Sequence, residues 1–234
     1  MIQEMDNQKR LYSVLPAMLL PFAGAWIYFV LASGTQFAMI SYTAVKCFTV
    51  AFPFIAYIWI DKKMPFREPV VLKEKLNGLG MGLITGTVIS LIILGCYFFT
   101  PLGEIVNNNS GRIKERVSGL GVIDYYIPFC LFISLIHSLI EEYFWRWYVY
   151  GNLKKLFSVK VSHILAAIAF SLHHFVILGA FFPLSITIFF GICVGIGGLV
   201  WSLQYEKYKN LTGSWVSHIL VDLCILGIGY FVIF

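Results

Sequence analysis

Long apolar runs separated by short polar stretches dominate the chain from end to end. A transmembrane helix needs about 20 consecutive apolar residues. Runs of about that length lie at roughly 11–32, 38–60, 77–101, 123–150, 158–178, 180–204 and 212–234. The pattern predicts an all-α, polytopic transmembrane helical bundle of about seven spans, within a range of roughly six to eight. A very tight turn near Pro183 joins the fifth span to the sixth.

Composition excludes a soluble domain, because 59% of the residues are hydrophobic and only 12% are charged, against about 25% charged in soluble domains. We expect residues 1–234 to form a single integral membrane domain.

The first run follows Lys9 and Arg10 as a signal peptide would, but its roughly 22 residues exceed the 7–15 of a signal peptide's apolar region. We expect it to remain as the first span.

Basic residues between the spans predict the orientation. One side carries twelve lysines and arginines and the other carries three, namely Arg112, Lys114 and Arg116. The twelve are Lys9, Arg10, Lys62, Lys63, Arg67, Lys73, Lys75, Lys154, Lys155, Lys160, Lys207 and Lys209. The positive-inside rule places the N-terminus in the cytoplasm and the C-terminus outside, in the cell membrane if the source is bacterial. The net charge of +5 therefore reflects membrane orientation, and we expect no nucleic-acid partner.

Ionisable residues interrupt three of the apolar runs. Such groups cost a few kcal/mol each inside a membrane and are functional candidates by default. They are Glu141, Glu142 and Arg146 in the fourth run, His173 and His174 in the fifth, and His218 and Asp222 in the seventh.

Helical spacing groups these residues. Glu142 and Arg146 are four apart and share a helix face, as do His218 and Asp222. Glu141 is rotated by about 100° from Glu142, which leaves one glutamate free for chemistry. A buried carboxylate beside imidazoles suits the activation of water for attack on a carbonyl, with a second group stabilising the oxyanion.

Other polar residues in the spans, taken alone, have structural interpretations. We expect Lys46 to be structural, and His137 and His163 to be interhelical hydrogen-bonding residues. A single ion pair within a span equally fits a role in helix packing. The three clusters together favour a functional site.

Three blocks stand in order in separate spans: Glu141-Glu142-x-x-x-Arg146, Phe170-x-x-x-His174 and His218-x-x-x-Asp222. In this the chain resembles the CPBP intramembrane proteases, also called the CAAX protease and bacteriocin-processing or Abi family, which includes the type 2 CAAX prenyl endopeptidases. The resemblance covers about 123–225, the expected catalytic core.

The resemblance implies a role for each motif residue. Glu141 would activate water with assistance from His174, Glu142 would pair with Arg146, and His218 with the residue four later would line the oxyanion site. That residue is Asp222, which cannot donate when ionised; it would instead orient His218 or help hold a metal. His173 leaves open which imidazole faces the site.

A metal-dependent scheme is the alternative to a metal-free one. Zn²⁺ would take Glu141, His174 and His218 as three protein ligands beside an open position. The sequence has no HExxH, the helical zinc-protease signature. We expect a glutamate-activated water and no cofactor.

The resulting hypothesis is an endopeptidase that hydrolyses a peptide bond of a membrane-associated protein or peptide in the lipid bilayer. The alternative is a non-catalytic membrane protein that binds a partner, such as a bacteriocin immunity factor or a scaffold. A transporter that relays protons through the buried acids and histidines fits less well, because the chain shows no internal repeat or matching broken helices.

Overall fold

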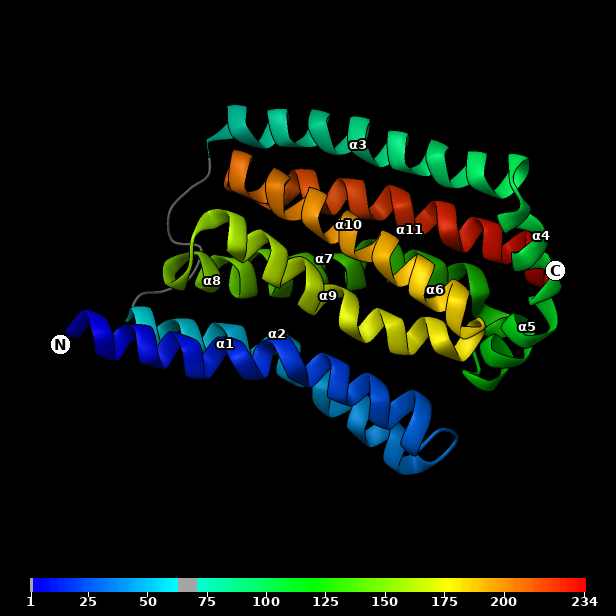
Figure 1. Ribbon diagram of the computed structural model, residues 1–234, viewed down its shortest axis with the longest axis horizontal. Coiled ribbons are helices and arrows are strands. Elements are labelled where there is room, and N and C mark those ends of the chain that lie inside the picture. The colour runs from blue at the N-terminus through cyan, green and yellow to red at the C-terminus, as the bar shows by residue number, and fades with distance from the viewer. Residues whose placement is uncertain (1, 63–70) are drawn as a thin grey trace.

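Helices make up all regular structure in the part of the chain that the computed structural model describes, residues 2–62 and 71–234. In chain order (Figure 1) they are α1 (Ile2–Trp26), η1 (Ile27–Leu31), α2 (Gln36–Asp61), α3 (Leu72–Phe99), α4 (Pro101–Asn108), α5 (Ser110–Gly119), η2 (Ile123–Tyr125), α6 (Tyr126–Phe132), η3 (Ile133–His137), α7 (Ser138–Glu142), η4 (Tyr143–Tyr150), α8 (Gly151–Leu156), α9 (Val159–Phe181), α10 (Leu184–Tyr208) and α11 (Thr212–Ile233).

Seven helical segments within the described residues are long and apolar enough to cross a membrane. They are Glu4–Leu31, Gln36–Asp61, Leu72–Phe99, Ile123–Leu156, Val159–Phe181, Leu184–Tyr208 and Thr212–Ile233. This confirms the predicted all-α polytopic bundle and an integral, multi-pass membrane protein. Phe182 and Pro183 form the tight turn between the fifth and sixth spans.

Two features of the prediction need correction or restriction. The segment between the third and fourth spans, for which no element was predicted, contains the helices α4 and α5. Lys63 and Arg67, which entered the charge count, lie outside the described residues.

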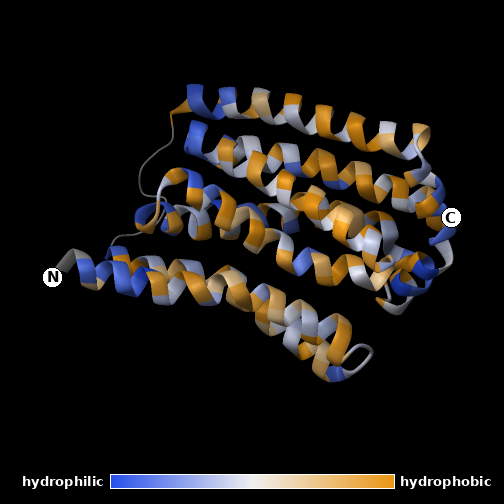
Figure 2. Cartoon of the chain, viewed as in Figure 1, coloured by the Kyte–Doolittle hydropathy of each residue, from blue (hydrophilic) through white to orange (hydrophobic). Residues whose placement is uncertain are grey.

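Hydrophobic residues predominate along the helices, and hydrophilic residues gather toward the ends of the bundle (Figure 2). Leu31, Phe99 and Phe231 are among the large apolar side chains that are exposed. In a membrane such side chains contact lipid tails, and backbone polar groups are satisfied within each helix.

Small residues bring α3 and α11 together. Gly78, Gly82 and Gly86 are buried at four-residue spacing on α3, the pattern that allows transmembrane helices to approach closely. A Cβ atom added at Gly82 would lie only 2.4 Å from the carbonyl oxygen of Gly213 on α11. This backbone contact fixes the position of α11.

The α1–α2 hairpin is held to α8 at its polar end. The guanidinium of Arg10 pairs with Asp61, and its Nη1 donates to Asn152 Oδ1 at 2.9 Å. Lys155 on α8 lies 3.3 Å from the same Asp61 carboxylate. The hairpin diverges from the other helices toward its turn (Figure 1).

Aromatic side chains fill the core where the spans cross. Phe144, Trp145 and Tyr148 from η4 pack with Phe170 from α9 and Trp201 from α10. Burial of aromatic rings next to the polar motif residues fixes their orientation, because each ring presents a broad packing surface.

Candidate active site

Glu141 and Glu142 lie on α7, a short α-helical segment between the π-helical turns η3 and η4. Turns of this kind are rare and frequently occur at functional sites. Both side chains are buried, with 8% of Glu141 and none of Glu142 exposed. The two carboxylates have partly different neighbours, as their 100° separation predicts, and His218 contacts both of them.

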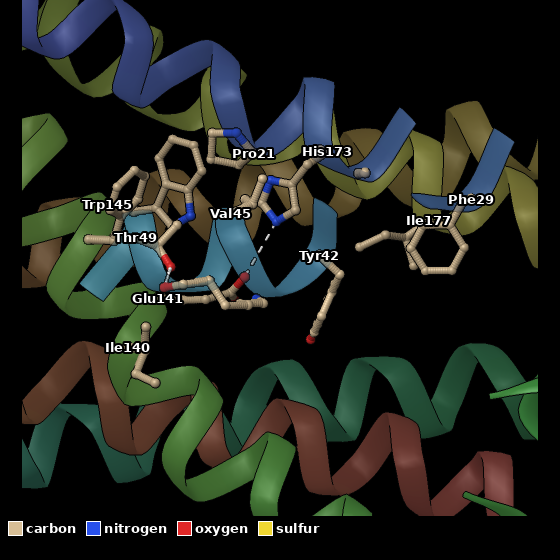
Figure 3. A pocket seen from close by; sticks show the side chains of 14 residues that line it. Pro21, Phe29, Tyr42, Val45, Thr49, Ile140, Glu141, Trp145, His173 and Ile177 are labelled. Atoms are coloured by element: carbon tan, nitrogen blue, oxygen red, sulfur yellow. Dashed lines mark hydrogen bonds and ion pairs between the residues drawn. The ribbon is translucent and has the colours of Figure 1, made fainter. Parts of the chain in front are cut away.

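Three imidazoles from three segments surround the Glu141 carboxylate. His173 Nε2 on α9 lies 3.4 Å from Oε1 (Figure 3). His218 Nε2 on α11 lies 3.8 Å from Oε2, and His137 Nδ1 at the end of η3 lies 3.9 Å from the same oxygen. A carboxylate among imidazoles is the arrangement that proton transfer requires.

Glu142 lies between a cation and an imidazole. Arg146 Nε is 3.1 Å from Glu142 Oε2, which agrees with the predicted pair, and His218 Nδ1 donates to Glu142 Oε1 at 3.0 Å. The ion pair is not aligned as a hydrogen bond, and within the described residues the terminal guanidinium nitrogens have no hydrogen-bond partner. The guanidinium instead lies 4.6 Å from the ring centroid of Phe170, a cation–π contact.

The imidazole of His218 also contacts Trp201 and Asp222. Its ring stacks on Trp201 with centroids 4.0 Å apart, and its Nε2 lies 3.6 Å from Asp222 Oδ1. The structure thus places His218 between the carboxylates of Glu141, Glu142 and Asp222. An ionised aspartate accepts but does not donate, and in this position the Asp222 carboxylate can accept from His218 Nε2.

His173 and His174 both lie at the site. His174 Nδ1 donates to the Phe170 carbonyl at 3.0 Å, which leaves Nε2 as its acceptor. The ring of His173 stacks parallel to Trp145. Glu141, His173 and His174 each offer one atom that could bind a metal, a carboxylate oxygen or a ring nitrogen. These three atoms lie within 4.8 Å of one another.

Those three atoms fit the donor set of a catalytic zinc site, which uses three protein ligands and an open position. This set contains His173 where the predicted set had His218. The same atoms serve equally well as the base and hydrogen-bonding partners of a metal-free site.

A cavity lies beside Glu141 and is walled mainly by apolar side chains. Its lining includes Pro21, Tyr42, Lys46, Trp145 and His173 (Figure 3). Its volume is about 70 Å³, and one water needs roughly 10–15 Å³ of such space. The cavity therefore has room for water at the carboxylate.

His137 and Lys46 lie beside Glu141, a position that the sequence did not predict, although His137 forms the interhelical hydrogen bond expected of it, with Lys46. Glu141 stands four positions after His137, and this spacing was the available signal. Lys46 carried no local signal, because its contact with His137 joins two distant helices. His163 behaves as expected, with contacts to Tyr150 and Ser202.

A polytopic membrane protein with a buried glutamate among imidazoles has the groups of an acid–base hydrolase. Residues 123–224 match the family model of the type II CAAX prenyl endopeptidases, Rce1-like. This segment carries all three motif blocks, and the match confirms the resemblance. The family supports an intramembrane protease that acts on membrane-associated protein substrates in a lipid bilayer. No curated protein and no solved structure matches the chain.

Proposed function

We propose that the protein is a glutamate-dependent intramembrane endopeptidase in which Glu141 activates water. The observation that carries the proposal is the position of the Glu141 carboxylate, which lines a cavity with room for water and lies within 3.4–3.9 Å of three imidazoles. As the family description names CAAX prenyl endopeptidases, a prenylated C-terminal segment is the first substrate class to test.

The reaction follows from the acid–base properties of these groups. Glu141 takes a proton from water while the water oxygen attacks the carbonyl carbon of the scissile bond. His173 and His174 orient the carboxylate and the water. Glu141 then gives the proton to the amide nitrogen as the carbon–nitrogen bond breaks, so that a carboxyl group and an amine are the products.

Negative charge that develops on the carbonyl oxygen needs a donor or a positive charge nearby. His218 supplies it in this proposal: its Nδ1 donates to Glu142 Oε1, and a proton on its Nε2 would face the oxyanion. Glu142 and Asp222 then hold His218 in place. Arg146 balances the charge of Glu142 from the buried side.

The test compares cells that express wild type with cells that express Glu141→Gln, using proteomics of membrane peptides to find new peptide ends. Gln keeps the shape of the side chain but cannot accept a proton, and loss of a general base lowers the rate by about 10²–10⁴-fold. Glu115→Gln on α5, an exposed carboxylate outside the three motif blocks, is the matched control.

New ends that appear with wild type and with Glu115→Gln, and that vanish with Glu141→Gln, support the proposal. If all three samples contain the same peptide ends at matched expression, the protease proposal is wrong. The non-catalytic, partner-binding alternative would then replace it.

A further inference from the structure

Lys46 lies in the second span, outside the three motif blocks, yet its side chain lines the cavity beside Glu141. Its Nζ is 2.5 Å from His137 Nε2 and 5.4 Å from the ring centroid of Tyr42. A lysine ammonium has donors and no acceptor, so His137 Nε2 accepts this hydrogen bond. The neutral ring of His137 then carries its proton on Nδ1.

That Nδ1–H group faces the site. His137 Nδ1 lies 3.9 Å from Glu141 Oε2, a separation longer than the 2.7–3.2 Å of a hydrogen bond. Catalytic hydrogen bonds are often long before substrate binds and shorten in the complex. His137 and Glu141 are four residues apart, so a small rotation of either side chain closes the distance.

The two oxygens of the Glu141 carboxylate therefore have different neighbours. Oε1 faces His173, whereas Oε2 faces His137 and His218. A carboxylate held through one oxygen presents the other to water in a fixed direction, which is the condition for efficient proton transfer.

We propose that Lys46 and His137 are positioning residues of the active site: Lys46 fixes the tautomer of His137, and the Nδ1–H group of His137 orients the Glu141 carboxylate. This inference rests on the proposed function. It adds contacts from α2 and η3 to a site that the motifs build from α7, η4, α9 and α11.

A simple link between α2 and η3 is the competing explanation for the same contact. It predicts lower stability for any variant that breaks the contact and no specific effect on turnover. A positioning role predicts a lower kcat at nearly constant KM, because the interaction matters in the transition state and not in substrate binding.

Four variants separate these roles. His137→Asn keeps an amide N–H near the Nδ1 position, and His137→Leu removes it. Lys46→Arg keeps a donor for Nε2, and Lys46→Met removes it. Thr43→Met, at an exposed position on the same helix, is the control for an added apolar side chain.

The assay measures kcat and KM of the purified full chain on a quenched fluorescent peptide that carries the cleavage sequence found in cells. We expect His137→Leu and Lys46→Met to lower kcat by roughly 10–100-fold, the usual effect of removing a group that orients an active-site residue. We expect KM to change by less than about twofold. His137→Asn and Lys46→Arg should recover most of the lost rate.

The double variant Lys46→Met with His137→Leu should be no slower than His137→Leu alone, since the two residues act through one contact. Wild-type kcat in Lys46→Met and His137→Leu would overturn the inference, and so would equal losses in the conservative and disruptive variants. If wild type and Glu141→Gln cleave equally, the proposed function fails and the inference falls with it.

Discussion

The close contact between α3 and α11 makes a quantitative prediction for Gly82→Ala. The added Cβ atom would lie 2.4 Å from the carbonyl oxygen of Gly213, whereas ordinary contacts begin at 3.4 Å. Both partners are backbone, so no side-chain rotation relieves the overlap. The two helices must separate locally by about 1 Å to restore an ordinary contact.

Gly80→Ala is the matched control, since nothing lies within 4 Å of its added Cβ atom. Both substitutions gain the same helix propensity, so their difference reports the overlap alone. Overpacking costs about 1–3 kcal/mol, and we expect Gly82→Ala to be less stable than Gly80→Ala by that amount.

Activity should fall as well, because α11 carries His218 only five residues after Gly213. A displacement of about 1 Å in an active site lowers the rate by up to about 10²-fold. The measurements are thermal unfolding in detergent micelles and peptide cleavage. Equal stability and equal activity of the two alanine variants would refute the close α3–α11 contact.

Three further predictions concern the buried pair, the metal and the orientation. Arg146→Met should lower the free energy of unfolding by up to about 3–5 kcal/mol, because it removes the guanidinium that balances the buried Glu142 carboxylate and leaves it only the contact with His218. Adding Glu142→Gln should recover part of this loss in the same unfolding assay, and no recovery would contradict the pairing. Cleavage should survive dialysis against EDTA, and loss of activity that Zn²⁺ restores would favour the zinc scheme. In a background without native cysteines, an impermeant thiol reagent added to intact cells should label Lys114→Cys and not Lys73→Cys; the opposite result would reverse the topology.

The sequence was sufficient for the spans and for the motif residues, because both depend on local pattern. Apolar runs identify membrane helices by composition alone, and the Glu142–Arg146 pair follows from spacing within one helix. The helices α4 and α5 escaped prediction because both are far shorter than a membrane span, and α5, with the sequence SGRIKERVSG, is also largely polar.

The remainder of the site depends on tertiary structure. The approach of Lys46 to His137 is set by how α2 packs beside η3, and a single sequence carries no local signal for that register. The π-helical turns on either side of α7 also change the directions of side chains that a regular helix would predict. The choice between His173 and His174 needed the position of α9 relative to α7, and the structure brings both rings to Glu141.

The different surroundings of the two adjacent glutamates support their different roles. Glu142 has no exposed surface and faces Arg146 and His218, so its charge is balanced and its carboxylate is out of reach of the cavity. Glu141 lines the cavity and faces imidazoles instead of a guanidinium. Two carboxylates in different environments divide acid–base work between them. Of the two, Glu141 combines a position on the cavity with imidazole neighbours, and for that reason we propose it as the base.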